Sequence, residues 1–154
     1  MAKSKAQLYE ELVLETSGLL EGETDMIANL ANVSALIWNK LPQVNWAGFY
    51  LLKGDELVLG PFQGKPACVR IPIGRGVCGT AAKTLKPQLI ADVHQFEGHI
   101  ACDQASNSEL VIPVIVKGEL KGVLDLDSPD FARFDKEDLS GLQQVVNIVQ
   151  DSLS

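Results

Sequence analysis

Three cysteines are the residues of this chain best suited to chemistry, and they are spaced too widely to form a local motif. Cys68 opens an expected strand, Cys78 opens an expected helix, and Cys102 lies in a polar, glycine-containing loop beside His99. A nucleophilic cysteine gains from partial exposure and from the positive potential of a helix N-terminus or a protonated histidine. A second cysteine can resolve a sulfenic acid into a disulfide. The pattern therefore favours thiol redox chemistry, although a plain core position suits Cys78 equally well.

Three carboxylates form a second candidate group. Glu109 begins an expected strand, and Asp125 and Asp127 end another, VLDLD. Residues two apart on a strand project from the same face, so both aspartates point the same way. A buried carboxylate costs free energy unless it binds a cation or holds a proton. A solvated strand end is the alternative interpretation.

A metal centre is not indicated by the spacing of the candidate ligands. There is no CxxC, HxxxH or similar close pair among Cys68, Cys78, Cys102, His94 and His99. We therefore expect no metal, and zinc would require a fold that assembles distant residues. A serine hydrolase is also disfavoured, because the chain has no GxSxG motif.

The segment from Gly74 to Gly79 reads GRGVCG and matches the dinucleotide fingerprint GxGxxG, with Asp92 at nearly the expected distance. A dinucleotide-binding unit needs a crossover helix that returns to a parallel strand, whereas Pro87 leaves room for only about two turns. We therefore interpret the glycines as permitting a tight strand-to-helix turn at the rim of a pocket.

The composition limits the classes of partner. The 154 residues suffice for one compact domain, and 13 basic against 20 acidic residues give a net charge of -7. That charge disfavours nucleic acid and anionic membranes as partners. No signal peptide and no apolar run of spanning length is visible, so we expect a cytoplasmic protein.

The hydrophobic periodicity indicates which elements hold these groups. Helices are predicted over 5–20 and 23–41, with Thr24 as the N-cap of the second, and over 135–153 at the end of the chain. Six short strands are predicted between them, at 46–53, 56–60, 68–73, 88–93, 109–116 and 119–127. A small helix is predicted between the third and fourth strands, at 79–85. The pattern predicts an α+β domain with a six-stranded, mostly antiparallel sheet flanked by N- and C-terminal helices. The segment 92–108 fits no regular element, and a loop of that length is typically functional.

Four segments together resemble the free methionine-(R)-sulfoxide reductases, a family of single GAF domains. They are NWAGFYLL, LVLGPFQGKPACVRIPIGRGVCGTA, DVHQFEGHIACDQASNSELVIPV and GVLDLDS, which together include all three cysteines, and through them the resemblance extends over nearly the whole chain. The resemblance implies a single GAF-like domain over 1–154. It also implies reduction of the R epimer of free methionine sulfoxide by thiols, without a cofactor.

The resemblance assigns roles to the three cysteines. Cys102 would be the nucleophile that takes the sulfoxide oxygen and becomes a sulfenic acid. Cys68 would then attack it to form a disulfide, while Cys78 would be an auxiliary or second resolving cysteine. A thioredoxin-like donor would reduce the disulfide.

The resemblance also places five residues in the substrate pocket: Glu109, Asp125, Asp127, Trp46 and Tyr50. A protonated Glu109 or Asp127 would protonate the sulfoxide oxygen, and an ionised Asp125 would bind the substrate ammonium. The two aromatic rings suit the methyl group and the polarised sulfur. No arginine partner for the substrate carboxylate is evident, so we expect backbone N–H groups of the 98–103 loop to receive it.

Two other functions stay open at this point. The first is a GAF sensor that binds a small molecule without turnover, and the second is a thiol switch that reacts with peroxide. The apolar faces of the terminal helices either pair two copies in a homodimer or pack against the chain's own sheet.

Overall fold

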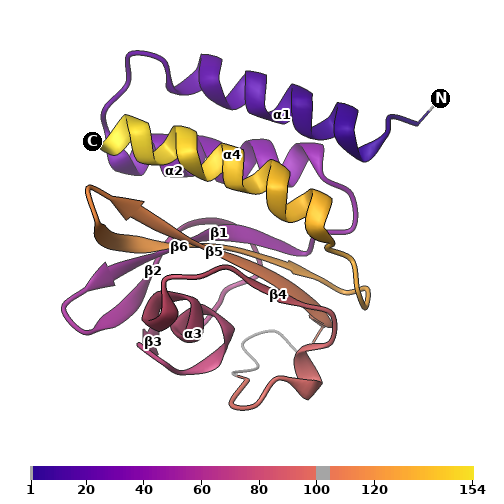
Figure 1. Ribbon diagram of the computed structural model, residues 1–154, viewed down its shortest axis with the longest axis vertical. Helices are drawn as coiled ribbons and strands as arrows, with labels where there is room; N and C mark the ends of the chain where they lie inside the picture. Colours follow the sequence, from indigo (N-terminus) through magenta and orange to yellow (C-terminus); the bar gives the residue numbers. More distant parts are fainter. Residues whose placement is uncertain (1, 100–104) are drawn as a thin grey trace.

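A curled antiparallel sheet organises the computed structural model, which describes residues 2–99 and 105–154 (Figure 1). The strand order is β3-β2-β1-β6-β5-β4, and neighbouring strands pair antiparallel throughout. The strands are β1 (Trp46–Lys53), β2 (Glu56–Gly64), β3 (Arg70–Pro72), β4 (Gln88–Ile90), β5 (Ser108–Val116) and β6 (Glu119–Ser128). The long strands β1, β6 and β5 are central, and the two three-residue strands form the edges.

Helices cover both faces of the sheet, in unequal amounts. Figure 1 shows α2 (Met26–Lys40) and α4 (Lys136–Leu153) against one face, with α1 (Lys5–Leu20) outside them. The short helix α3 (Gly76–Thr84) lies on the opposite face. This arrangement confirms the predicted α+β architecture with a six-stranded antiparallel sheet and terminal helices.

Side-chain caps fix the N-termini of the long helices. Ser4 and Gln7 form a capping box at α1, and the Asp135 carboxylate accepts from the backbone at the start of α4. At α2 the cap is Asp25, whose carboxylate accepts from the Ala28 N–H, so the prediction of Thr24 as N-cap was wrong by one residue. Asp and Thr cap equally well by type, and only the backbone path decides between adjacent candidates.

The sheet separates two apolar clusters. The alternation of side chains along β1 sends Ala47 and Phe49 to the face covered by α2 and α4, and Trp46 and Tyr50 to the face of α3. The first cluster is the larger and is built mostly from aliphatic side chains of the three long helices and the central strands. The second cluster is smaller, and the candidate site residues of the strands lie among it or next to it.

Some segments differ from their predicted bounds. The strand expected over 68–73 is reduced to Arg70–Pro72, and the helix expected over 79–85 begins at Gly76. The segment 92–108 contains one turn of 3-10 helix, Val93–Gln95, whose Val93 is buried. Within the described residues, no helix is both long and apolar enough to cross a membrane.

Candidate active site

Strand register brings the predicted carboxylates together on the α3 face. Glu109 of β5 lies opposite Asp127 of β6, and Asp125 lies opposite Val111, one pleat farther along. On the other side of β6, Trp46 of β1 is the partner of Asp127. Directly opposed and diagonal residues on one face of a sheet come within side-chain reach of each other. The shared face predicted for the two aspartates is confirmed, since both line the same pocket.

The glycine segment 74–79 places Cys78 above these carboxylates. Gly74 and Gly76 have φ values of +89° and +65°, a left-handed conformation that favours glycine. The Gly74 N–H donates to the Gly79 carbonyl at 2.8 Å, which closes the turn into α3. A Cβ at Gly79 would lie 2.6 Å from the Pro72 carbonyl oxygen, so the helix packs too closely on β3 for any side chain. The tight strand-to-helix turn predicted from the sequence is thus present.

The dinucleotide-binding alternative does not fit this topology. The helix after the glycines, α3, leads to β4, which pairs antiparallel with β5 instead of returning as a parallel strand. A dinucleotide fold requires a parallel crossover at this point. The GxGxxG match therefore describes a turn and not a phosphate cradle.

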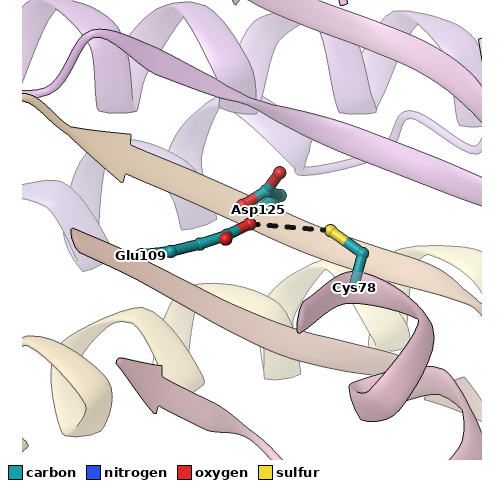
Figure 2. Close-up of side chains that lie close together, drawn as sticks. All are labelled: Cys78, Glu109 and Asp125. Atoms are coloured by element: carbon teal, nitrogen blue, oxygen red, sulfur yellow. Dashed lines mark hydrogen bonds between the residues drawn. The ribbon is translucent and has the colours of Figure 1, made fainter. Parts of the chain in front are cut away.

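Cys78, Glu109 and Asp125 form a buried cluster in the pocket lining, and Figure 2 shows how close together these three side chains lie. The Cys78 thiol donates to Glu109 Oε2 at 3.8 Å, and one Sγ or carboxylate oxygen from each residue lies within 4.8 Å of the others. The three residues are only 4%, 6% and 5% exposed, respectively. Asp125 Oδ1 has no hydrogen-bond partner among the described residues. A buried carboxylate oxygen in this situation is ready to accept a donor or a cation from a ligand.

Burial and mutual repulsion hold protons on this cluster. Burial, together with the charges of Asp125 and Asp127, raises the pKa of Glu109 well above its usual value. Burial also raises the pKa of Asp125 to about 6, a shift that hydrogen bonds from Glu109 and Cys78 limit. Burial and the same carboxylates raise the pKa of the Cys78 thiol. The site therefore favours a proton on Glu109, a neutral Cys78 thiol and, above pH about 6, an ionised Asp125.

Two stacked aromatic rings form one wall of the pocket. The ring centroids of Trp46 and Tyr50 are 5.8 Å apart. The Trp46 indole N–H donates to the Lys65 carbonyl at 3.1 Å, and the Tyr50 hydroxyl donates to the Cys68 carbonyl at 2.9 Å. The same side chains therefore provide an apolar surface and hold the segment that carries Cys68. Burial of Tyr50 beside the carboxylates raises the pKa of its phenol, so it stays a donor.

The two described cysteines differ in state. Cys68 is disulfide-bonded, whereas Cys78 is a buried free thiol. Cys102, the predicted nucleophile, lies outside the described residues, as does most of the 98–103 loop. A raised pKa makes the Cys78 thiol a poor nucleophile, which agrees with an auxiliary rather than an attacking role.

The two histidines of the candidate metal set occupy different environments. His99 lines the pocket, whereas His94 is largely exposed and its ring Nδ1 lies 2.8 Å from the Asp92 carboxylate. The structure instead brings Cys78 together with carboxylates from two strands, a grouping that sequence spacing could not reveal.

The pocket has a volume of about 50 Å³, which is on the scale of a small ligand. Sequence reasoning missed two polar residues of its lining, Arg75 and Ser106. The position of Arg75 in the turn immediately before α3 was the available signal, because a helix N-terminus that borders a pocket favours anions. The site thus combines a cationic residue, a set of carboxylates and an aromatic wall. Such a set can bind a zwitterion, donate a proton and receive an apolar group.

Comparisons with known proteins agree with this geometry. The family model described as GAF domain matches residues 28–154. The chain is 58% identical to the free methionine-R-sulfoxide reductase of Escherichia coli (strain K12) over 143 residues, which are 93% of this chain and 87% of that protein. It is similar to the free methionine-R-sulfoxide reductase of Neisseria meningitidis in complex with its substrate, with 42% identity, a TM-score of 0.96 and coverage of 99% and 92%. It is also similar to fRMsr of Staphylococcus aureus in complex with substrate, with 51% identity, a TM-score of 0.92 and 95% of each chain covered.

Proposed function

This chain belongs to the GAF domain family and, within it, to the free methionine-R-sulfoxide reductases. We propose that it binds free L-methionine-(R)-sulfoxide in the pocket described above and reduces it there to methionine. The observation that carries the proposal is the buried meeting of Glu109 and Asp125 beside the Trp46–Tyr50 wall, which adjoins the Cys68 segment. The family members with solved substrate complexes support the choice of substrate.

Recognition of a free amino acid follows from the charges around the pocket. Ionised Asp125 accepts the substrate ammonium through charge-assisted hydrogen bonds, and its unpartnered Oδ1 is available for them. A methionine sulfoxide within a peptide lacks this ammonium and would leave a buried carboxylate unpaired. The carboxylate partner expected from the 98–103 loop lies largely outside the described residues, and Arg75 is a cationic partner at the same pocket.

Reduction of a sulfoxide requires protonation of its oxygen as the S–O bond breaks. Burial and two neighbouring carboxylates raise the pKa of Glu109, which favours the protonated form that a proton donor needs. We assign Glu109 as the proton donor, with Asp127, its cross-strand neighbour, as the alternative. The Trp46 and Tyr50 rings hold the methyl and the polarised sulfur.

The thiol steps use Cys102 and Cys68. The Cys102 thiolate takes the sulfoxide oxygen, which gives methionine and a Cys102 sulfenic acid. The Cys68 thiol then attacks the sulfenic sulfur, forms a Cys68–Cys102 disulfide and releases water. An external dithiol of the thioredoxin type reduces the disulfide to two thiols and is itself oxidised. The disulfide-bonded state of Cys68 supports its role as the resolving cysteine.

Steady-state turnover tests the proposal. Wild-type protein and Cys102→Ser are supplied with dithiothreitol and with the free R epimer, the free S epimer or a peptide-bound sulfoxide. We expect turnover of the free R epimer alone and its loss in Cys102→Ser. Binding of the R epimer without turnover would instead favour the sensor function, and consumption of peroxide would favour the thiol switch.

Three further expectations stay predictions. The thioredoxin-like donor is checked by coupled turnover with thioredoxin and its reductase in place of dithiothreitol. The homodimer is checked by sedimentation equilibrium, and the exposed Leu14 and Leu19 of α1 are the apolar side chains available to a partner copy. The cytoplasmic location is checked by fractionation, since thiol cycling requires a reducing compartment.

A further inference from the structure

We propose that Cys78, Glu109 and Asp125 form a site for a thiophilic divalent cation such as Zn²⁺, which binds reversibly in the pocket. The three side chains come from α3, β5 and β6, so the fold assembles ligands that are far apart in the sequence. This inference does not depend on the proposed reductase activity, because it concerns cation binding alone.

The geometry of the cluster is that of a compact ligand set. One sulfur and two carboxylate oxygens lie within 4.8 Å of one another, close enough for all three to reach one ion after small side-chain rotations. Figure 2 shows the Cys78 thiol of α3 directed toward the Glu109 carboxyl group, with the Asp125 carboxyl group close beside them. Cysteine sulfur and carboxylate oxygen are both ordinary zinc ligands, and three protein ligands leave a fourth tetrahedral position for water.

The unpartnered Asp125 Oδ1 is a second sign of an absent ligand, and it is the same oxygen for which the substrate ammonium would compete. Asp125 is 95% buried, and the hydrogen bonds from Glu109 and Cys78 that limit its pKa leave this oxygen without a donor among the described residues. Protons on Glu109 and Cys78 reduce the charge of the cluster but do not give Oδ1 a hydrogen bond. A cation at the centre of the cluster would be coordinated by this oxygen.

The charges around the cluster favour a cation. Asp127 lines the same pocket and adds a third carboxylate, whereas Arg75 is the single lysine or arginine among the described lining residues. Binding of Zn²⁺ displaces the protons of the Cys78 thiol and the Glu109 carboxyl to solvent, so no oxidant or reductant is involved. Because the ligands belong to the pocket itself, an ion bound there excludes another ligand from the same space.

Cobalt titration tests the site by a spectroscopic signature. The probe is Co²⁺ alone, added to a Cys68→Ser/Cys102→Ser double variant in which Cys78 is the sole cysteine. We expect a near-ultraviolet sulfur-to-cobalt charge-transfer band that saturates at one equivalent and is displaced by Zn²⁺. In case the double variant does not fold, the same titration is made on wild-type protein with Cys68 disulfide-bonded and Cys78 free.

Single changes on the same background assign the ligands. Cys78→Ser should abolish the band, and Asp125→Asn and Glu109→Gln should each weaken cobalt binding by roughly tenfold to a hundredfold. Asp127→Asn is the comparison variant, since it removes a carboxylate of the same pocket that lies outside the three-ligand set, and it should weaken cobalt binding less than Asp125→Asn or Glu109→Gln. No band at all, or a band that Asp125→Asn and Glu109→Gln leave unchanged, would overturn the proposal.

Addition of free methionine-R-sulfoxide separates this proposal from the proposed function. Loss of the cobalt band on addition supports a shared pocket and therefore both proposals. A band that persists at saturating sulfoxide supports the cation site and contradicts the placement of the substrate.

Discussion

The Tyr50 hydroxyl donates a hydrogen bond of 2.9 Å to the backbone carbonyl of Cys68. This contact joins the central strand β1 to the segment that carries a disulfide-bonded cysteine. Trp46, four residues earlier on the same face of β1, holds the neighbouring Lys65 carbonyl in the same way. The aromatic wall therefore fixes the position of Cys68 relative to the carboxylates on β5 and β6.

Removal of this hydrogen bond should slow the resolving step more than the reductive step. Tyr50→Phe keeps the ring and its stacking but leaves the Cys68 carbonyl without its donor, so we expect a loss of about 1 kcal/mol in stability. In a single turnover, methionine should be released at a near-normal rate while disulfide formation lags severalfold. Rapid quench with thiol counting measures both. Equal slowing of the two steps would contradict a positioning role for Tyr50.

Tyr9→Phe provides the matched change outside the site. The Tyr9 hydroxyl donates to Asp138 Oδ1 at 2.6 Å, and Asp138 is fully buried between α1 and α4. A hydrogen bond to a buried carboxylate is worth about 1.5–3 kcal/mol, so denaturant unfolding should show a loss of that size. Because this contact lies on the opposite face of the sheet from the pocket, kcat/KM should be unchanged. A fall in kcat/KM of tenfold or more would show that the two layers are coupled.

Two glycine-to-alanine substitutions compare the tight contact of α3 with β3 against an open position in α1. In Gly79→Ala the new methyl would meet the Pro72 carbonyl oxygen at 2.6 Å, so the start of α3 must move and carry Cys78 with it. We expect a loss of about 1–3 kcal/mol in stability together with reduced activity. Gly18→Ala in α1 meets nothing within 4 Å and should stabilise the protein by about 0.5–1 kcal/mol without affecting activity. Thermal unfolding of both variants distinguishes the two cases.

The protonation states of the cluster predict a bell-shaped dependence of kcat/KM on pH. Activity should rise through pH about 6, because Asp125 must ionise to bind the ammonium. Activity should fall at higher pH as Glu109 loses the proton that it donates, and its raised pKa moves this fall above the usual carboxyl range. Because Asp125 and Glu109 interact, the two limbs report apparent pKa values of the coupled pair and not of either residue alone. Asp125→Asn should remove the acidic limb and Glu109→Gln the basic limb, each with lower activity. A wild-type profile that is flat between pH 5 and pH 9 would contradict the assignment.

Hydrophobic periodicity predicted the long elements of the fold, because each long helix or strand repeats its apolar residues at the spacing of one buried face. The β1–β2 and β5–β6 hairpins lie close to their predicted ranges, as do the three long helices. The edge strands β3 and β4 are shorter than predicted. Edge strands pair on one side only, so the tertiary contacts that decide their ends leave little trace in hydrophobicity.

The sequence predicted several of the residues that line the pocket, but only part of their geometry. The spacing of Asp125 and Asp127 predicts their shared face, since strand alternation is a local property. The meeting of Cys78 with Glu109 depends on the packing of α3 on the sheet, which no local pattern encodes. Arg75 was overlooked for a similar reason, because its place at the pocket follows from the direction in which the turn enters α3.

A single turnover without external reductant is the most direct test of the central claim. Fully reduced protein is mixed with one equivalent of free L-methionine-(R)-sulfoxide and the cysteine peptides are then mapped by mass spectrometry. We predict that one equivalent of methionine is released, that Cys68 and Cys102 are joined and that Cys78 remains a free thiol. Absence of methionine, or its release with no Cys68–Cys102 bridge, would contradict the account.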